Sequence, residues 1–80
     1  MDQKNINEQV CAVVRAIRHY RITIDYSQEF MASKLFISQN AYSKVELGRS
    51  RLYVDRMLSI AEILQVDIRL LLQGYSEKMQ

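Results

Sequence analysis

Apolar residues recur at helical spacing along most of the chain. Near the N-terminus they follow one another at intervals of three and four residues, which places them on one face of an α-helix. These residues are Ile6, Val10, Val13, Ile17 and Tyr20. Asn5, with Glu8 three residues further on, fits a capping box, so we expect this helix to begin near Asn5 or Asn7.

The periodicity breaks at residues 22–24 and resumes as two short helical segments. The break consists of three β-branched residues, which we interpret as the link out of the first helix, with a short extended segment as the alternative. Beyond it, the pattern predicts helices over residues 28–34 and 39–47. Ser27 and Ser38 stand where side chains would cap these two helices.

Two further helices complete the pattern. One is predicted over residues 54–64, and a shorter one follows the capping residue Asp67 and ends at Gly74. The chain contains no proline and only two glycines, fewer turn residues than a β-sandwich or barrel requires. We therefore predict an all-α fold, a compact five-helix bundle. The whole chain is expected to form one domain, with a core over about 6–73 and a tail over 74–80.

Composition argues against several classes of protein. The single cysteine, Cys11, permits no intramolecular disulfide and has no histidine placed to share a zinc ion, so we expect it to be a small buried hydrophobe. No apolar run approaches the roughly 20 residues of a membrane span, and the N-terminus lacks the order of a signal peptide. One histidine, with no glycine-rich phosphate loop and no nucleophile–base pair, argues against an enzyme. We expect a cytoplasmic protein with neither metal nor cofactor and no contact with a membrane.

The basic charge is concentrated in the middle of the chain, although the net charge is only +2. Residues 34–56 carry five basic and two acidic side chains, whereas residues 57–80 carry two basic and three acidic ones. A basic middle favours a polyanionic partner. Chance clustering on a solvated surface is the alternative that charge alone leaves open.

A set of spaced residues connects the middle of the chain to a known family. They are Ile17, Tyr20, Arg21, Ser27, Gln28, Ala32, Ile37, Ser38, Gln39, Lys44, Glu46, Gly48, Ile60, Ala61, Leu64, Val66, Asp67 and Ile68. With this combined spacing, residues 17–72 resemble the Xre-type helix-turn-helix domain of phage repressors, Cro proteins and many small bacterial regulators. The resemblance implies that the segments at 28–34 and 39–47 form a helix-turn-helix. It also implies that the protein is a DNA-binding transcriptional regulator of the repressor type.

The outward positions of the segment at 39–47 have the chemistry of a base-reading face. In a helix-turn-helix, the second helix enters the major groove, which is wide enough for one α-helix. Its outward side chains in this chain are Gln39, Asn40, Ser43 and Lys44. Glutamine and asparagine can make paired hydrogen bonds to adenine, and lysine can donate to guanine. The alternative is that these residues are only the polar face of an exposed helix.

Further residues flank this face. The resemblance implies that Gln28 holds a phosphate at the start of the helix over 28–34, where the helix N-terminus also favours an anion. Ser38 is expected to cap the following helix and to contact DNA in addition. Arg49 and Arg51 come just after that helix and are placed to hold phosphates on its other side.

The resemblance also implies an internal ion pair between Arg21 and Glu46, which would link the first helix to the third. Three positions depart from the family pattern. Phe36 stands in the turn where the family has glycine, so either the turn differs or Phe36 compensates by packing. Tyr53 replaces the usual small capping residue, and Tyr42 is larger than the aliphatic residue common at its position.

We expect the protein to bind as a homodimer to a two-fold symmetric operator, because one domain contacts too few bases for useful specificity. The short last helix cannot bury all of its apolar side chains, and we expect the excess to form the dimer contact. These residues are Leu70, Leu72, Tyr75 and Met79. The alternative function is an antitoxin or adaptor whose main partner is another protein, for which Phe36, Tyr53 and the apolar C-terminus are the motivation.

Overall fold

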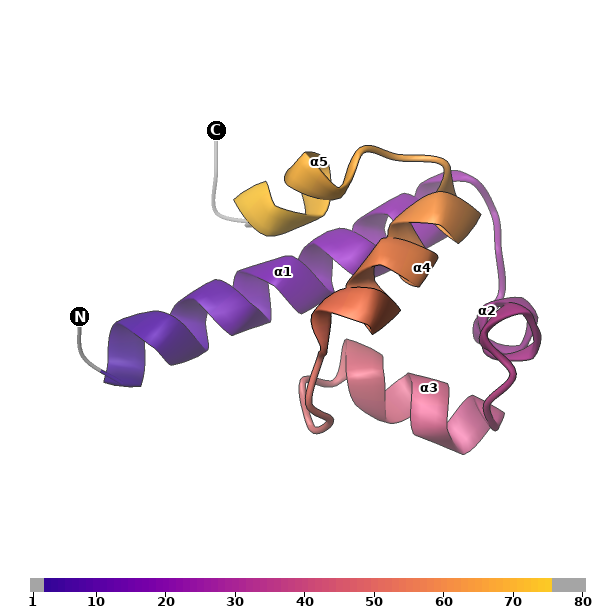
Figure 1. Cartoon of the computed structure of the whole chain (residues 1–80), viewed down its shortest axis with the longest axis horizontal. Coiled ribbons are helices and arrows are strands. Elements are labelled where there is room, and N and C mark those ends of the chain that lie inside the picture. The colour runs from indigo at the N-terminus through magenta and orange to yellow at the C-terminus, as the bar shows by residue number, and fades with distance from the viewer. Residues whose placement is uncertain (1–2, 76–80) are drawn as a thin grey trace.

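The computed structural model describes the backbone of residues 3–75 and the side chains of residues 7–75. Within that range the chain forms five α-helices and no strand (Figure 1). The helices are α1 (Gln3–Thr23), α2 (Gln28–Leu35), α3 (Gln39–Glu46), α4 (Val54–Leu64) and α5 (Ile68–Gln73). The predicted all-α fold with a helix-turn-helix at α2 and α3 is confirmed. The predicted bounds of α2 to α5 are correct to within about one residue.

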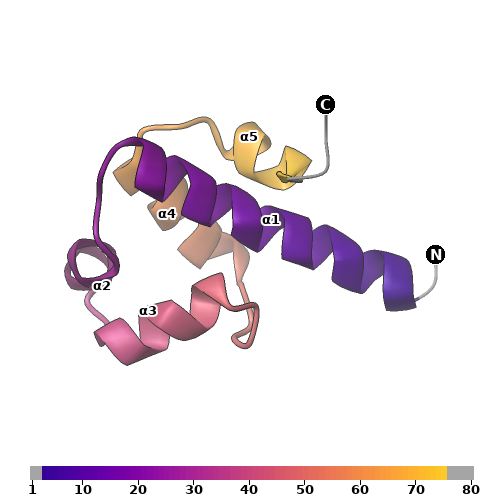
Figure 2. The same ribbon diagram turned by 180° about the vertical axis from the view of Figure 1, so that it is seen from behind.

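α1 is the axis around which the shorter helices are arranged. α1 contacts α3, α4 and α5, while α2 packs against α3 and α4. In two opposite views, α5 lies along one side of α1 and α3 lies at the opposite edge of the molecule (Figures 1 and 2). α3 therefore has one long side that no other described helix covers.

α1 extends further at both ends than the sequence predicts. It begins at Gln3, so Asn5 lies inside the helix and does not cap it, and it continues to Thr23. β-branched residues lower helix propensity by only about 0.5 kcal/mol each, which is too little for Ile22 and Thr23 to end a helix of 21 residues. Thr23 Oγ1 also donates a hydrogen bond to the carbonyl of His19 at 2.8 Å. The predicted link at 22–24 is therefore wrong. Among the described helices, α1 included, none has the length and apolar character needed to cross a membrane.

All five helices contribute to one apolar core. Its buried members are Ala16, Ile17, Met31, Ala32, Tyr42, Val45, Met57, Ile60, Ala61, Leu64 and Leu71. Tyr42 is the largest of the fully buried side chains, and its hydroxyl therefore needs a partner inside the protein. Cys11 is exposed, so the expectation of a buried cysteine is wrong. It lies about one turn before Arg15 and two turns before Arg18 on α1, and all three side chains are exposed.

Four of the five helices end in the same type of turn. In each, the residue after the helix or shortly after it has a left-handed backbone, and the next amide donates to a carbonyl five residues earlier, as in a Schellman motif. The left-handed residues are Asp25, Phe36, Gly48 and Gln65. Only Gly48 is a glycine, and the other three adopt φ values near 60° without its conformational freedom.

Phe36 adopts a left-handed turn at the position where the resemblance leads us to expect glycine. Its backbone has φ 60° and ψ 40°, and its amide donates to the carbonyl of Ser33 at 3.2 Å. The amide of Ile37 donates to Ala32 at 3.0 Å, which completes the turn. The side chain does not compensate by packing, because it is 94% exposed. Neither expected form of compensation is present: the turn is unchanged, and the phenylalanine faces solvent.

The end of α5 is attached to α1. The amide of Tyr75 donates to the carbonyl of Ala12 at 2.9 Å, and Arg15 Nε donates to the carbonyl of Tyr75 at 3.2 Å. The Tyr75 ring stacks on His19 with 4.2 Å between ring centroids. A Cβ on Gly74 would lie 2.7 Å from the Cβ of Ala12, so the close approach requires glycine. The start of the predicted tail is therefore fixed to α1, and its remaining residues lie outside the described range.

Candidate nucleic-acid interface

α3 has two chemically different faces. Tyr42 and Val45 are buried in the core. Gln39, Asn40 and Lys44 are exposed. Because side chains four residues apart lie on the same side of a helix, Asn40 and Lys44 form one outward stripe, with Gln39 beside its first turn. Two amides and an ammonium group are thus presented together by a helix whose other side is fixed in the core.

Serine side chains mark the start and the edge of this outer face. Ser38 caps α3, since its Oγ accepts a hydrogen bond from the amide of Ala41 at 3.0 Å. The Ser38 hydroxyl is exposed and keeps its own proton for a further contact. Ser43 is half-buried at the edge of the face. The first-turn amides of α3 add a partial positive charge at the same end of the helix.

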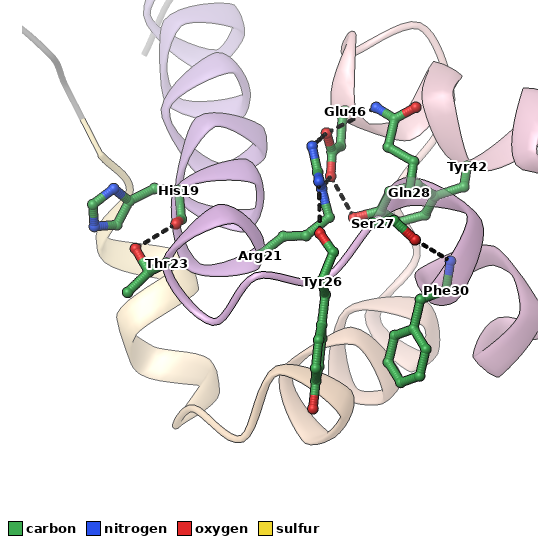
Figure 3. Close-up of polar contacts among 9 residues, drawn as sticks. All are labelled: His19, Arg21, Thr23, Tyr26, Ser27, Gln28, Phe30, Tyr42 and Glu46. Carbon is green, nitrogen blue, oxygen red and sulfur yellow. Dashed lines mark hydrogen bonds and ion pairs between the residues drawn. The ribbon is translucent and has the colours of Figure 1, made fainter.

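Glu46 connects α3 to the two preceding helices (Figure 3). Its Oε2 accepts from Arg21 Nε at 2.6 Å and from the Tyr42 hydroxyl at 2.5 Å. Its Oε1 accepts from Arg21 Nη2 at 3.0 Å and from Gln28 Nε2 at 3.1 Å. These four hydrogen bonds occupy the lone-pair sites that an ionised carboxylate offers. The side chain of Glu46 is only 3% exposed and that of Arg21 12%, so the charges are paired where water hardly reaches them.

The network shifts the acidity of each of its ionisable members. Burial alone would raise the pKa of Glu46, but hydrogen bonds from Arg21, Tyr42 and Gln28 outweigh it and leave that pKa below its ordinary value. Burial, together with donation to Glu46, raises the pKa of Tyr42 far above that of a free tyrosine. The hydrogen bond to Glu46 raises the pKa of Arg21 although burial opposes it. Near neutral pH the carboxylate and the guanidinium are therefore charged and the phenol is neutral.

Gln28 belongs both to this network and to the surface. It is the first residue of α2, follows the capping residue Ser27, and is half-buried. One of its amide hydrogens is used for Glu46. The second amide hydrogen and the free amides of the first turn of α2 can still donate to an anion. Glu46 thereby orients the side chain that the resemblance assigns to a phosphate.

Arg49 and Arg51 lie in the exposed loop between α3 and α4. Among the described side chains, neither guanidinium has a hydrogen-bond or ion-pair partner. Two unpaired cations just beyond α3 give this side of the molecule a positive charge that can attract phosphates.

The residues predicted for a dimer contact do not share one surface. Leu70 and Leu72 are exposed on α5, and Leu72 lines an apolar groove of about 540 Å³ bounded by α1, α5 and the start of α4. The apolar residues of the groove are Val10, Ala12, Val13, Leu52, Met57 and Leu72. Tyr75 is turned away from this groove and stacks on His19. Met79 lies outside the described residues.

The hydroxyl of Tyr42 is the part of the site that the sequence pattern does not reveal, because the pattern shows Tyr42 only as a large apolar residue. A signal was present in the spacing, since Tyr42 precedes Glu46 by four residues and side chains at that spacing meet on a helix. The exposure of Phe36 had no comparable signal, because local sequence does not show which neighbours would cover the ring.

A family model described as helix-turn-helix matches residues 17–71, more than half of the chain. Comparisons with curated proteins and with solved structures gave no match. The matched range contains α2, α3 and α4 completely, together with both members of the Arg21–Glu46 pair. The N-terminal half of α1 and the contact made by Tyr75 lie outside it.

Proposed function

The chain belongs to the Xre-type helix-turn-helix family of DNA-binding transcriptional regulators, and from this premise we propose that it is a sequence-specific regulator that reads its operator through α3. The observation that carries the proposal is the outer face of α3, where Gln39, Asn40 and Lys44 are exposed. Paired hydrogen bonds from such amides to adenine discriminate against a wrong base by about 1–3 kcal/mol each.

The attachment of α3 supports this role. A base-reading side chain must reach its base edge with little positional freedom, because a loose site loses the geometry of paired hydrogen bonds. The inner face of α3 is held by Tyr42 and Val45 in the core and by Glu46 to α1 and α2. The reading face is thus preorganised before DNA is bound.

Phosphate contacts complete the proposed interface. Gln28 at the start of α2 holds a phosphate of one DNA strand. Ser38 contacts the DNA backbone near the start of α3. Arg49 and Arg51 hold the backbone beyond the end of α3. Such contacts fix register and orientation and make affinity salt-dependent, while the outer face of α3 supplies the sequence preference.

We further propose a homodimer on a two-fold symmetric operator, with half-sites about 34 Å apart. The contact is centred on Leu72 and the apolar groove beside it. Leu70 does not line this groove and Tyr75 stacks on His19 away from it, so neither belongs to this contact. Leu72→Glu is expected to convert a dimer into a monomer in sedimentation, whereas Leu58→Glu, on the comparably exposed face of α4, leaves the dimer intact. A wild-type monomer at high concentration, both with and without operator, contradicts the dimer.

Selection of bound sequences from random duplex DNA tests the proposed function. The expected result is one enriched motif with two-fold symmetry and adenines in each half-site. Recovery of no preferred motif, or binding that does not depend on salt, contradicts a sequence-specific regulator.

The second candidate function is an antitoxin or adaptor whose main partner is another protein. The observation that favours it is the same apolar groove, in which Val10 and Leu72 remain exposed. The two functions differ in what Leu72→Glu does. Loss of the homodimer assigns the groove to a second copy of the chain. An unchanged oligomeric state combined with loss of a defined, co-purified small protein assigns it to that partner.

A further inference from the structure

Phe36 combines two costs that nothing else in the described structure offsets. Its ring is 94% exposed, more than any other large hydrophobic side chain described, and its backbone lies in the left-handed region. A left-handed conformation costs a residue with a Cβ more than it costs glycine, and a bulky aromatic residue rarely adopts it. The other residues besides glycine with a positive φ are Asp25 and Gln65, and their polar side chains lose nothing by facing water. An exposed, strained phenylalanine indicates a contact that the isolated chain does not contain.

Phe36 lies close in sequence to the start of α3. It lies two residues before Ser38, the cap of α3, and three before Gln39 on the proposed reading face. Ile37, between them, packs against the core, so the turn is fixed beside the start of α3. A partner that contacts Phe36 therefore comes close to the start of the helix that is proposed to enter DNA.

The charge around Phe36 fits the same partner. No acidic residue occurs from position 30 to position 45, and Lys34 is exposed two residues before Phe36. The amides of the first turn of α3 add partial positive charge on the other side. A polyanion is attracted to this end of the helix-turn-helix, and an apolar ring within it needs an apolar group on that polyanion. The methyl group of thymine, which projects into the major groove, is such a group, and phenylalanine is among the residues that contact it.

We propose that Phe36 is a specificity-determining DNA contact whose ring packs against the C5-methyl group of a thymine at the edge of each half-site. The proposal rests on the proposed function, since it requires that α3 enters the major groove. The proposed contact also explains why this position holds a phenylalanine although glycine would relieve the strain. The ring is covered when the operator is bound.

A uracil scan of the selected operator tests this directly, because replacing thymine by uracil removes only the methyl group. Each thymine is replaced in turn, and the affinity of the wild type is measured beside that of Phe36→Gly and of the control Leu58→Ala, whose leucine is 52% exposed on α4. For the wild type and the control, one position per half-site is expected to weaken binding about fourfold, the effect of losing one buried methyl group. For Phe36→Gly, the same replacement is expected to change nothing.

Thermal melting keeps the result interpretable. Phe36→Gly is expected to melt at a higher temperature than the wild type, because glycine adopts the left-handed turn without strain. Its weaker operator binding then cannot result from unfolding. If Phe36→Gly binds the operator as tightly as the wild type, or retains the same sensitivity to uracil, the contact does not exist. If the wild type selects no DNA motif at all, it is the proposed function that fails.

Discussion

On its inner face, α3 buries Tyr42 and surrounds the carboxylate of Glu46 with four donors. On its outer face, on the other side of the helix, Gln39, Asn40 and Lys44 face solvent. The inner face has its hydrogen bonds completed within the chain, and among the described buried side chains no polar atom lacks a partner. The outer face has donors and acceptors that no other described side chain pairs, so they are free to exchange water for a partner. The inner face therefore serves folding and the outer face is available for recognition. Substitutions on the inner face should change the stability of the fold, and substitutions on the outer face should change DNA binding.

The largest effect on the inner face is expected from Arg21→Ala. It leaves the buried carboxylate of Glu46 without its opposite charge, which costs about 3–5 kcal/mol of unfolding free energy. The matched control is Arg69→Ala, because Arg69 pairs with Asp67 at 2.8 Å but is fully exposed. Denaturant unfolding should show a large shift in midpoint for the first variant and no measurable shift for the control. Equal shifts would contradict the importance of burial.

A smaller loss of stability is expected from Tyr42→Phe. The ring still fills the core, but the Glu46 carboxylate no longer accepts the hydrogen bond from the Tyr42 hydroxyl. A hydrogen bond to a charged group is worth about 1.5–3 kcal/mol. Tyr53→Phe is the control, since Tyr53 caps α4 without a side-chain hydrogen bond and is exposed. Both variants are compared by thermal melting. A Tyr42→Phe protein as stable as the wild type would show that the hydroxyl adds nothing to the attachment of α3.

The free energy of unfolding should fall in acid, and part of this loss should depend on Glu46. Its pKa is lower in the folded chain, so the unfolded state binds more protons once the pH falls to the ordinary glutamate value of about 4.3. The stabilisation is therefore complete above that pH and is lost as the pH falls through the lower folded value. The Glu46→Gln variant should be less stable than the wild type at neutral pH. Its free energy of unfolding should also change less as the pH falls into the acid range.

The smallest effect is expected beyond the end of α3. Arg49→Gln removes one proposed phosphate contact, so it should weaken binding to all sequences alike and reduce the salt slope by about 0.9 per subunit. Stability should not change, because the guanidinium has no partner among the described side chains. Affinity is measured over a range of salt concentrations for a selected duplex and an unrelated one. A change in preference between the two duplexes would assign Arg49 to base reading instead.

Much of the fold could be predicted because its signals are local. Ser27, Ser38 and Asp67 each cap the helix that the sequence indicates, and each accepts the expected backbone hydrogen bond. Gly48 ends α3 with the expected positive φ. These features depend on a few neighbouring residues, so spacing and residue type are sufficient to find them.

The features that sequence analysis missed depend on residues far apart in the chain. α1 continues through Ile22 and Thr23 although the local pattern favours a break there, because the cost of two β-branched residues is small beside the stability of the packed helix. Tyr75 is held by Ala12 and His19, more than 50 residues earlier, which no local pattern indicates. Cys11 is exposed because it shares one side of α1 with the exposed side chains of Arg15 and Arg18. The exposure of Gln39, Asn40 and Lys44 on α3 could be predicted from sequence, whereas the attachment of α3 through the Tyr42 hydroxyl required the structure.

The central claim is that the outer face of α3 reads DNA and contributes nothing to folding. The most direct measurement is the affinity of the double variant Gln39→Ala/Asn40→Ala for the selected operator and for an unrelated duplex, together with its melting temperature. We predict an unchanged melting temperature, retained salt-dependent binding to both duplexes, and loss of the preference for the operator. A double variant that still prefers the operator as strongly as the wild type would contradict the claim.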